Sequence, residues 1–202
     1  GLHGVETSRR VHGAIEGPGE IDRVLKNTLQ LIDRLAATPA LIISTPIAFS
    51  PDYAELEDAV GILETIRKVK AFCSGTVGVE SIPELAPYRG RITELKGKTG
   101  MNAFADTGLD SALKERGVEH LIFAGAITSV CIDSTARAAV ECGYKPAILS
   151  DCTCGRTQFE QEFYCDKVFP IYSRVLDHQT LLQQLDVPRD EVPSLIDERR
   201  VD

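Results

Sequence analysis

Cys131 is the residue whose type and position in this sequence are most typical of a catalytic nucleophile. It follows the apolar segment HLIFAG (120–125) and falls at the start of a segment with helical periodicity. The N–H groups of a first helical turn have no acceptor within the helix, and the helix dipole favours an anion there. Such a position favours the thiolate, the nucleophilic form of a thiol whose ordinary pKa is about 8.5. A buried structural cysteine is the alternative interpretation, because free cysteine is among the most buried residue types.

Lys98 is the second candidate, in the segment KGKTGMNAF (96–104) beyond the weaker strand RITEL (91–95). A lysine at the same edge of the fold as Cys131 would stabilise the thiolate and pass a proton during a reaction. The alternative is a lysine on the solvated surface, where this residue type is usually found.

The elements that must position these residues alternate between short apolar runs and segments of helical periodicity. The runs predict strands at 40–45, 91–95, 120–125 and 145–151, and the periodic segments predict helices near 20–38, 54–70, 107–117, 129–143, 157–168 and 178–185. This order predicts an α/β fold, a three-layer doubly wound and mostly parallel sheet with helices on both faces. The loops that follow the strands then meet at one edge of the sheet, where ligands bind.

Composition predicts one domain over residues 1–202, with a charged tail or arm at about 186–202. Of 202 residues, 43% are hydrophobic and 26% charged, which is ordinary for a globular protein. The net charge of −8 argues against nucleic acid or an anionic membrane as a partner. No apolar run is long enough to span a membrane, and no secretory signal is evident. Because the six cysteines are scattered, as in a reducing compartment, we expect a cytoplasmic protein that acts on a small molecule.

Several short motifs between about residues 97 and 152 follow one another in a fixed order. They are Lys98, Ala103–Phe104, Thr107–Asp110, the set Gly125, Thr128 and Cys131, the pair Gly143–Tyr144, and Asp151. In this order and spacing the chain resembles the isochorismatase-like cysteine hydrolase superfamily, and the similarity extends from about residue 20 to 185. Many matches in one order are more specific than any single motif.

The resemblance implies a three-layer α/β fold and hydrolysis through a Cys–Lys–Asp triad. It implies that Cys131 is the nucleophile, that Lys98 is the triad lysine, and that the peptide bond before Ile127 is cis. The N–H groups of Ile127 and Cys131 would form the oxyanion hole, an arrangement that stabilises the developing negative charge. We expect Phe104, Phe49 and Thr128 to contact the substrate, and the resemblance also implies a homo-oligomer.

The triad aspartate is where the sequence departs from the family pattern. In the family it ends a first, central apolar strand, but GLHGVETSRRVHGAIEGPG (1–19) contains neither an apolar run nor an aspartate. A sheet without its central strand leaves two strands with unpaired backbone groups, which is costly. We therefore expect that the sequence given has lost the N-terminal segment that carries this strand. We do not assign Glu6, Glu16 or Glu20 as the acid of the triad.

We expect neither a metal nor a cofactor. The loop STPIAFSPDYAELEDA (44–59) has no histidine where the zinc-binding branch of the family carries one, and His3, His12, His120 and His178 are dispersed with no ligand pair. Cys152 and Cys154 form a C-x-C pair without partners, which favours a core role over metal or redox chemistry.

These observations favour a cysteine-dependent amidohydrolase that cleaves a C–N bond in an amide, carbamoyl or ureido group of a small molecule through an acyl-enzyme on Cys131. The alternative is a catalytically idle family member that acts as a binding or assembly module, because the triad aspartate is missing. A thiol redox protein is a third hypothesis and depends only on Cys152 and Cys154.

Overall fold

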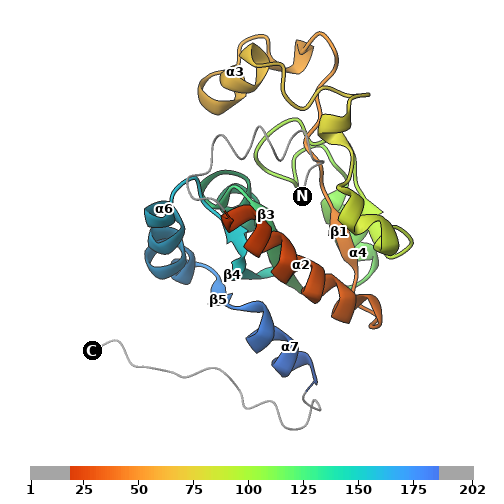
Figure 1. The fold of residues 1–202 in the computed structure, drawn as a ribbon, viewed down its shortest axis with the longest axis vertical. Coiled ribbons are helices and arrows are strands. Elements are labelled where there is room, and N and C mark those ends of the chain that lie inside the picture. Colours follow the sequence, from red (N-terminus) through yellow and green to blue (C-terminus); the bar gives the residue numbers. More distant parts are fainter. Residues whose placement is uncertain (1–18, 187–202) are drawn as a thin grey trace.

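The computed structural model describes residues 19–186, which form two short parallel sheets flanked by helices (Figure 1). One sheet pairs β1 (Ile42–Ser44) with β2 (Ile92–Glu94), and the other has the order β3 (His120–Ala126), β4 (Lys145–Cys154) and β5 (Arg174–Leu176). The parallel pairing and the flanking helices confirm the predicted α/β class. The predicted tail and the N-terminal residues His3, Glu6, His12 and Glu16 lie outside the described residues.

The predicted sheet is divided into two parts. Within residues 19–186, no ladder of hydrogen bonds joins β1 to β3, so each of these strands has one unpaired edge. Their side chains nevertheless belong to one apolar cluster, which includes Leu41 and Ile43 beside β1 and Leu121 and Phe123 on β3. Side-chain packing rather than backbone pairing therefore connects the two sheets in this part of the chain.

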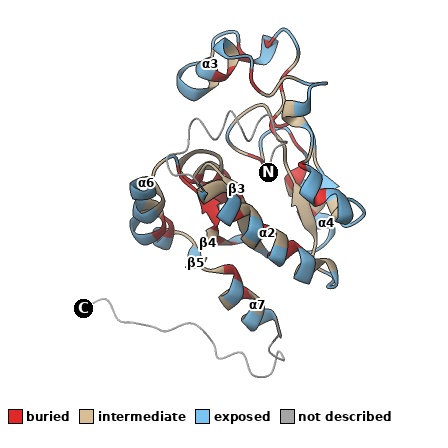
Figure 2. Ribbon diagram, viewed as in Figure 1, coloured by how far each residue is buried: buried red, intermediate tan, exposed pale blue. Residues whose placement is uncertain are grey.

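Helix α2 (Glu20–Ala36) packs against both sheets. On one side Leu31 packs with Leu149 of β4, and on the other Ile32 packs beside Ile42 of β1. Buried residues gather beneath α2 and around β3 and β4 (Figure 2). The predicted apolar stripe of α2 is therefore the surface that spans the division between the sheets.

Between residues 19 and 186, five further α-helices form close to the predicted positions. They are α3 (Gly61–Lys68), α4 (Leu109–Glu115), α5 (Asp133–Glu141), α6 (Gln158–Phe163) and α7 (His178–Asp186). Short 3-10 helices cover Ala54–Leu56, Val77–Val79, Pro83–Tyr88 and Phe169–Ile171, and π-helical turns cover Thr128–Ile132 and Tyr164–Val168. No helix within residues 19–186 has the length and apolar character needed to cross a membrane.

Three local predictions are corrected. The predicted helix at 54–70 is divided into the 3-10 helix Ala54–Leu56 and α3, which begins at Gly61 with a left-handed φ of 62°. Strand β4 does not end at Asp151 but continues to Cys154. Val140, a candidate core position in the predicted helix 129–143, is 40% exposed while Ala139 is fully buried, because the 3.6-residue period of α5 places residue 139 rather than 140 on the buried face with Ile132 and Ala136.

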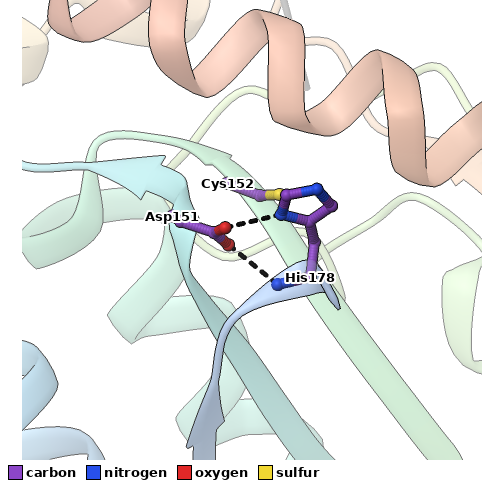
Figure 3. Close-up of side chains that lie close together, drawn as sticks. All are labelled: Asp151, Cys152 and His178. Atoms are coloured by element: carbon purple, nitrogen blue, oxygen red, sulfur yellow. Dashed lines mark hydrogen bonds and ion pairs between the residues drawn. The ribbon is translucent and has the colours of Figure 1, made fainter. Parts of the chain in front are cut away.

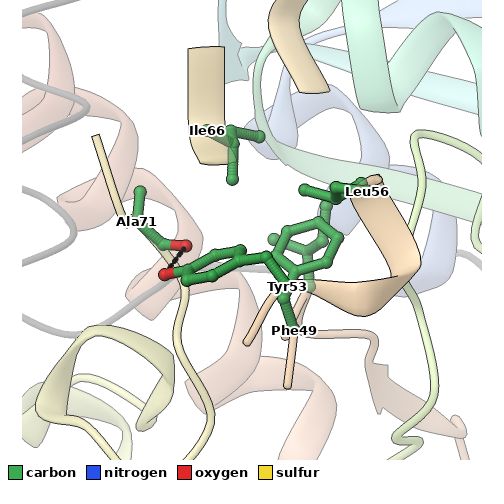
Figure 4. Close-up of a cluster of buried hydrophobic side chains, with 6 residues drawn as sticks. Phe49, Tyr53, Leu56, Ile66 and Ala71 are labelled. Atoms are coloured by element: carbon green, nitrogen blue, oxygen red, sulfur yellow. Dashed lines mark hydrogen bonds between the residues drawn. The ribbon is translucent and has the colours of Figure 1, made fainter. Parts of the chain in front are cut away.

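A separate apolar cluster lies in the segment around α3, which projects away from the two sheets in Figure 1. Phe49 and Tyr53 stack at its centre with ring centroids 6.0 Å apart, and Leu56 and Ile66 pack beside them (Figure 4). The Tyr53 hydroxyl donates a hydrogen bond to the carbonyl of Ala71 at 3.0 Å. This cluster gives the segment a core of its own.

Candidate active site

Cys131 lies in the π-helical turn Thr128–Ile132, directly before α5. The residue is half-buried, so its thiol is neither sealed in the core nor fully exposed. The peptide bond Ala126–Ile127 that precedes the turn is cis, as the resemblance implies. The predicted nucleophile is therefore placed where a strand end meets the start of a helix.

The backbone carbonyl of Ile127 closes the turn that carries Cys131. It accepts hydrogen bonds from the N–H groups of Val130 at 3.1 Å and Ile132 at 3.3 Å. The N–H of Ile127 has no acceptor within residues 19–186. That N–H is therefore available to an oxygen atom of a bound molecule.

Lys98 is buried, with 4% of its surface exposed. Its backbone carbonyl accepts a hydrogen bond from the N–H of Ala48 at 3.1 Å, which fixes the loop after β2 against the loop after β1. In the described part of the chain, its ammonium group has no hydrogen bond and no ion pair. The alternative of a solvated surface lysine is therefore wrong.

The loop that follows Lys98 packs on the helix that carries Cys131. The hydroxyl of Thr135 accepts a hydrogen bond from the N–H of Ala103 at 3.0 Å and donates to the carbonyl of Met101 at 3.3 Å. Thr135 is four residues after Cys131 and therefore lies on the same side of the helix. Tertiary contacts thus bring together the two segments that the sequence analysis assigned to the site.

The three predicted substrate contacts lie in different surroundings. Phe49 and Thr128 have no exposed surface, and Phe104 is half-buried and stacks on Tyr144 with ring centroids 5.8 Å apart. Contact of these residues with substrate stays a prediction. A groove of about 840 Å³ lies nearby between the loops after β1 and β2, and the residues that flank Lys98 contribute to its wall.

Polar residues of α6 contact the turn of Cys131 and were not singled out from the sequence. Ser129 donates a hydrogen bond to the carboxylate of Glu160, and Arg156 pairs with the same carboxylate at 2.8 Å. Burial alone raises the pKa of Glu160, but the hydrogen bonds from Ser129 and Arg156 outweigh it, so the pKa is lower than the ordinary value. The hydroxyl of Thr128 donates a hydrogen bond to Gln161, the residue that follows Glu160 in α6. The polar residues of the segment TQFEQEF (157–163) were the sequence signal that could have identified these contacts.

A second polar cluster contains Asp151, Cys152 and His178, whose potential ligand atoms all lie within 4.8 Å of one another (Figure 3). The prediction that the histidines have no neighbouring ligand residue is therefore wrong for His178. The sequence could not show this, because β4 and α7 meet only in the tertiary structure.

The contacts of His178 show what the cluster does. Its Nδ1 lies 2.5 Å from Asp151 Oδ2, its Nε2 lies 3.0 Å from Gln30 Oε1, and its backbone N–H donates to Asp151 Oδ1 at 2.9 Å. Burial raises the pKa of the Cys152 thiol to about 12, which favours the protonated thiol. A metal ion would have to replace both the histidine–aspartate contact and the thiol proton. In this structure the hydrogen bonds of the cluster connect β4, α2 and α7.

A family model described as the isochorismatase domain matches residues 7–180. The chain belongs to the isochorismatase family. The family and the fold class inferred from the motifs are therefore confirmed.

Among relatives of this isochorismatase-family chain is the ureidoacrylate amidohydrolase RutB of Variovorax paradoxus (strain S110), 38% identical over 84 residues. That alignment covers 42% of this chain and 32% of the relative, so the chain matches about a third of the relative's length.

Solved structures show the same fold. An isochorismatase-like hydrolase from Alkaliphilus metalliredigens superposes with a TM-score of 0.72 at 22% identity, covering 86% of this chain and 93% of that one. The N-carbamoylsarcosine amidase of Thermoplasma acidophilum gives a TM-score of 0.65 at 18% identity, covering 80% of this chain and 86% of that one.

Proposed function

We propose that this hydrolase cleaves a C–N bond in an amide, carbamoyl or ureido group of a small molecule, with Cys131 as the nucleophile. The observation that carries the proposal is the buried ammonium group of Lys98, which has no partner within residues 19–186. Burial of an unpaired charge costs several kcal/mol, so such a group is expected where chemistry needs it. The packing of its loop on the helix of Cys131 supports a shared site.

The proposed reaction has two steps. The Cys131 thiolate attacks the carbonyl carbon, the C–N bond breaks, and the leaving amine takes a proton from the Lys98 ammonium group. Water then attacks the thioester, one of its protons returns to Lys98, and the acid product leaves as the thiolate forms again. Atoms and charge balance without any cofactor.

The backbone N–H groups of Ile127 and Cys131 are proposed to bind the oxyanion that forms in each step. The unused N–H of Ile127 supports this role. Donors of this kind contribute about 3 kcal/mol each to stabilisation of a transition state.

The names of two similar proteins support the bond class. One is an amidohydrolase of ureidoacrylate and the other an amidase of N-carbamoylsarcosine, so both act on C–N bonds beside a carbonyl. The specific alternative is a catalytically idle binding module. It is favoured by one observation, that no carboxylate within residues 19–186 pairs with Lys98.

Ammonia release from a ureidoacrylate, an N-carbamoyl amino acid and a primary amide tests the proposal. We expect turnover of at least one compound by the wild type, and loss of at least about 1,000-fold in Cys131→Ser with the fold unchanged, because a hydroxyl is far less acidic than a thiol. The control is Cys142→Ser, because Cys142 is an exposed cysteine at the C-terminal end of α5. Acylation of Cys131, detected as a mass increase after rapid acid quench, would support the mechanism. No turnover and no adduct with any of the three would favour the idle module.

A further inference from the structure

The turn that carries Cys131 is anchored by two consecutive residues of α6. Thr128 Oγ1 donates a hydrogen bond to Gln161 Oε1 at 2.5 Å, and Ser129 donates to the carboxylate of Glu160. The two donors are likewise consecutive and lie at the start of the turn. The path of the backbone toward Cys131 is therefore fixed from another helix.

Strand β4 holds Gln161 in a single orientation. Its amide nitrogen donates to the carbonyl of Ser150 at 2.9 Å and contacts the hydroxyl of Thr153 at 3.1 Å. Because a carbonyl only accepts hydrogen bonds, the amide nitrogen must face Ser150 and the amide oxygen must face Thr128. Thr128 and Thr153 have no exposed surface, so water cannot replace Gln161 as their partner.

Gly155 permits the close approach of α6 to the end of β4. A Cβ atom at this position would lie 3.0 Å from the backbone nitrogen of Gln161 and 3.3 Å from side-chain atoms of Glu160. The chain therefore has no side chain at the position where the two anchoring residues approach β4.

We propose that Gln161 is a positioning residue that sets the direction of the Cys131 thiol through Thr128. This inference rests on the proposed function, in which Cys131 is the nucleophile. Without the Gln161 amide, the buried Thr128 hydroxyl loses its acceptor and the turn shifts to find another. A displacement of about 1 Å at a reacting atom lowers rates by about 100-fold.

Near-isosteric substitutions test the hydrogen bond between Thr128 and Gln161. Gln161→Met removes the acceptor and Thr128→Val removes the donor, whereas Thr128→Ser keeps the hydroxyl. We expect the first two to lower kcat by about 10- to 100-fold with KM changed less than about 3-fold, and Thr128→Ser to stay near wild type. The double variant should have a kcat no lower than that of the more severe single variant, because both substitutions remove the same hydrogen bond between Thr128 and Gln161. The control is Gln158→Met on the same helix, because within residues 19–186 the side chain of Gln158 bonds only to exposed Glu162.

A second measurement is independent of turnover. Alkylation of Cys131 by iodoacetamide, followed by peptide mass between about pH 6 and 9, reports the thiolate and its access to the reagent. In Gln161→Met and Thr128→Val we expect the midpoint of the pH profile to rise and the rate at neutral pH to fall several-fold. Gln158→Met should leave both unchanged. Circular dichroism and thermal unfolding check that each variant is folded, and Thr128→Val is decisive if Gln161→Met does not fold.

The outcomes separate this inference from the proposed function. If both substitutions lower the melting temperature but leave the alkylation profile and kcat at wild-type values, the role is only structural and the positioning proposal is wrong. If the profiles shift as expected but the wild type cleaves none of the three compounds, positioning is supported and the amide-cleaving function fails.

Discussion

The buried ionisable side chains include two kinds, the cysteine thiols and the ammonium group of Lys98. The buried thiols of Cys152, Cys154 and Cys165 have pKa values raised by burial to about 12, 11 and 11, so burial favours their uncharged form. Lys98 is buried to a similar degree in the described structure and also has no partner for its charge. Packing explains the buried thiols, whereas we propose that Lys98 is buried because the reaction uses its proton.

Lys98→Met should separate catalysis from stability. Because a buried ammonium group without a partner costs free energy, replacing it with an apolar side chain of similar length should leave the free energy of unfolding equal or higher. Loss of a general acid should lower kcat by about 100-fold or more. Urea unfolding and steady-state kinetics measure the two effects, with exposed Lys96→Met as the control. An equal loss of activity in both variants would remove Lys98 from the mechanism.

At the scale of secondary-structure elements, α6 and α7 are fixed by side chains that contact β4. Gly155 lets α6 approach the strand, and the pair formed by Asp151 and His178 joins α7 to it. Both contacts depend on a particular residue at one position, so single substitutions can test them.

Gly155→Ala should destabilise the protein by about 1–3 kcal/mol, because the added Cβ meets backbone and side-chain atoms of α6. The same substitution should also lower kcat, since α6 anchors the turn of Cys131. Gly90→Ala is the matched control, because no atom lies within 4 Å of its added Cβ. Chemical unfolding of both variants provides the measurement. Equal stabilities would show that α6 moves aside without cost.

His178→Ala should cost about 2 kcal/mol of stability, because it removes the buried imidazole together with its contacts to Asp151 Oδ2 and Gln30 Oε1. The same change at exposed His120 should shift the free energy of unfolding by less than about 0.5 kcal/mol. Hydrogen exchange should show faster opening of α7 only in the first variant. Unchanged protection of α7 in His178→Ala would contradict the assigned connection.

At the scale of the whole molecule, the buried thiols predict an alkaline limit to stability. Their pKa values in the folded protein lie above the ordinary value of a thiol, so the folded state holds its thiol protons to a higher pH than the unfolded state. Their contribution is therefore complete below about pH 9 and is lost as the pH rises toward 11 and 12. Each thiol contributes at most about 1.4 kcal/mol per pH unit.

Urea unfolding at intervals between about pH 7 and 11 measures this slope. In Cys154→Ala the decline above pH 9 should be shallower than in the wild type, whatever the stability of the variant at neutral pH. Parallel curves for the two proteins would show that this thiol does not ionise on unfolding in that range.

The local pattern of apolar residues and glycines in the sequence was sufficient to predict much of the fold. The helical stripe of α2, the strands at 120–125 and 145–151 and the helix ends at Gly117 and Gly143 follow from periodicity and from glycine conformation, both properties of neighbouring residues. The motif order around Cys131 was sufficient for the family, because it depends on residue type and spacing alone.

Other features required the tertiary structure, because they join residues far apart in the chain. The contact of Thr128 with Gln161, the pairing of Asp151 with His178 and the burial of Lys98 depend on how elements pack, which no local period encodes. The sheet is divided because β1 and β3 do not pair within residues 19–186. The sequence therefore determined which groups are available for chemistry, and packing decided which of them are buried and which of them meet.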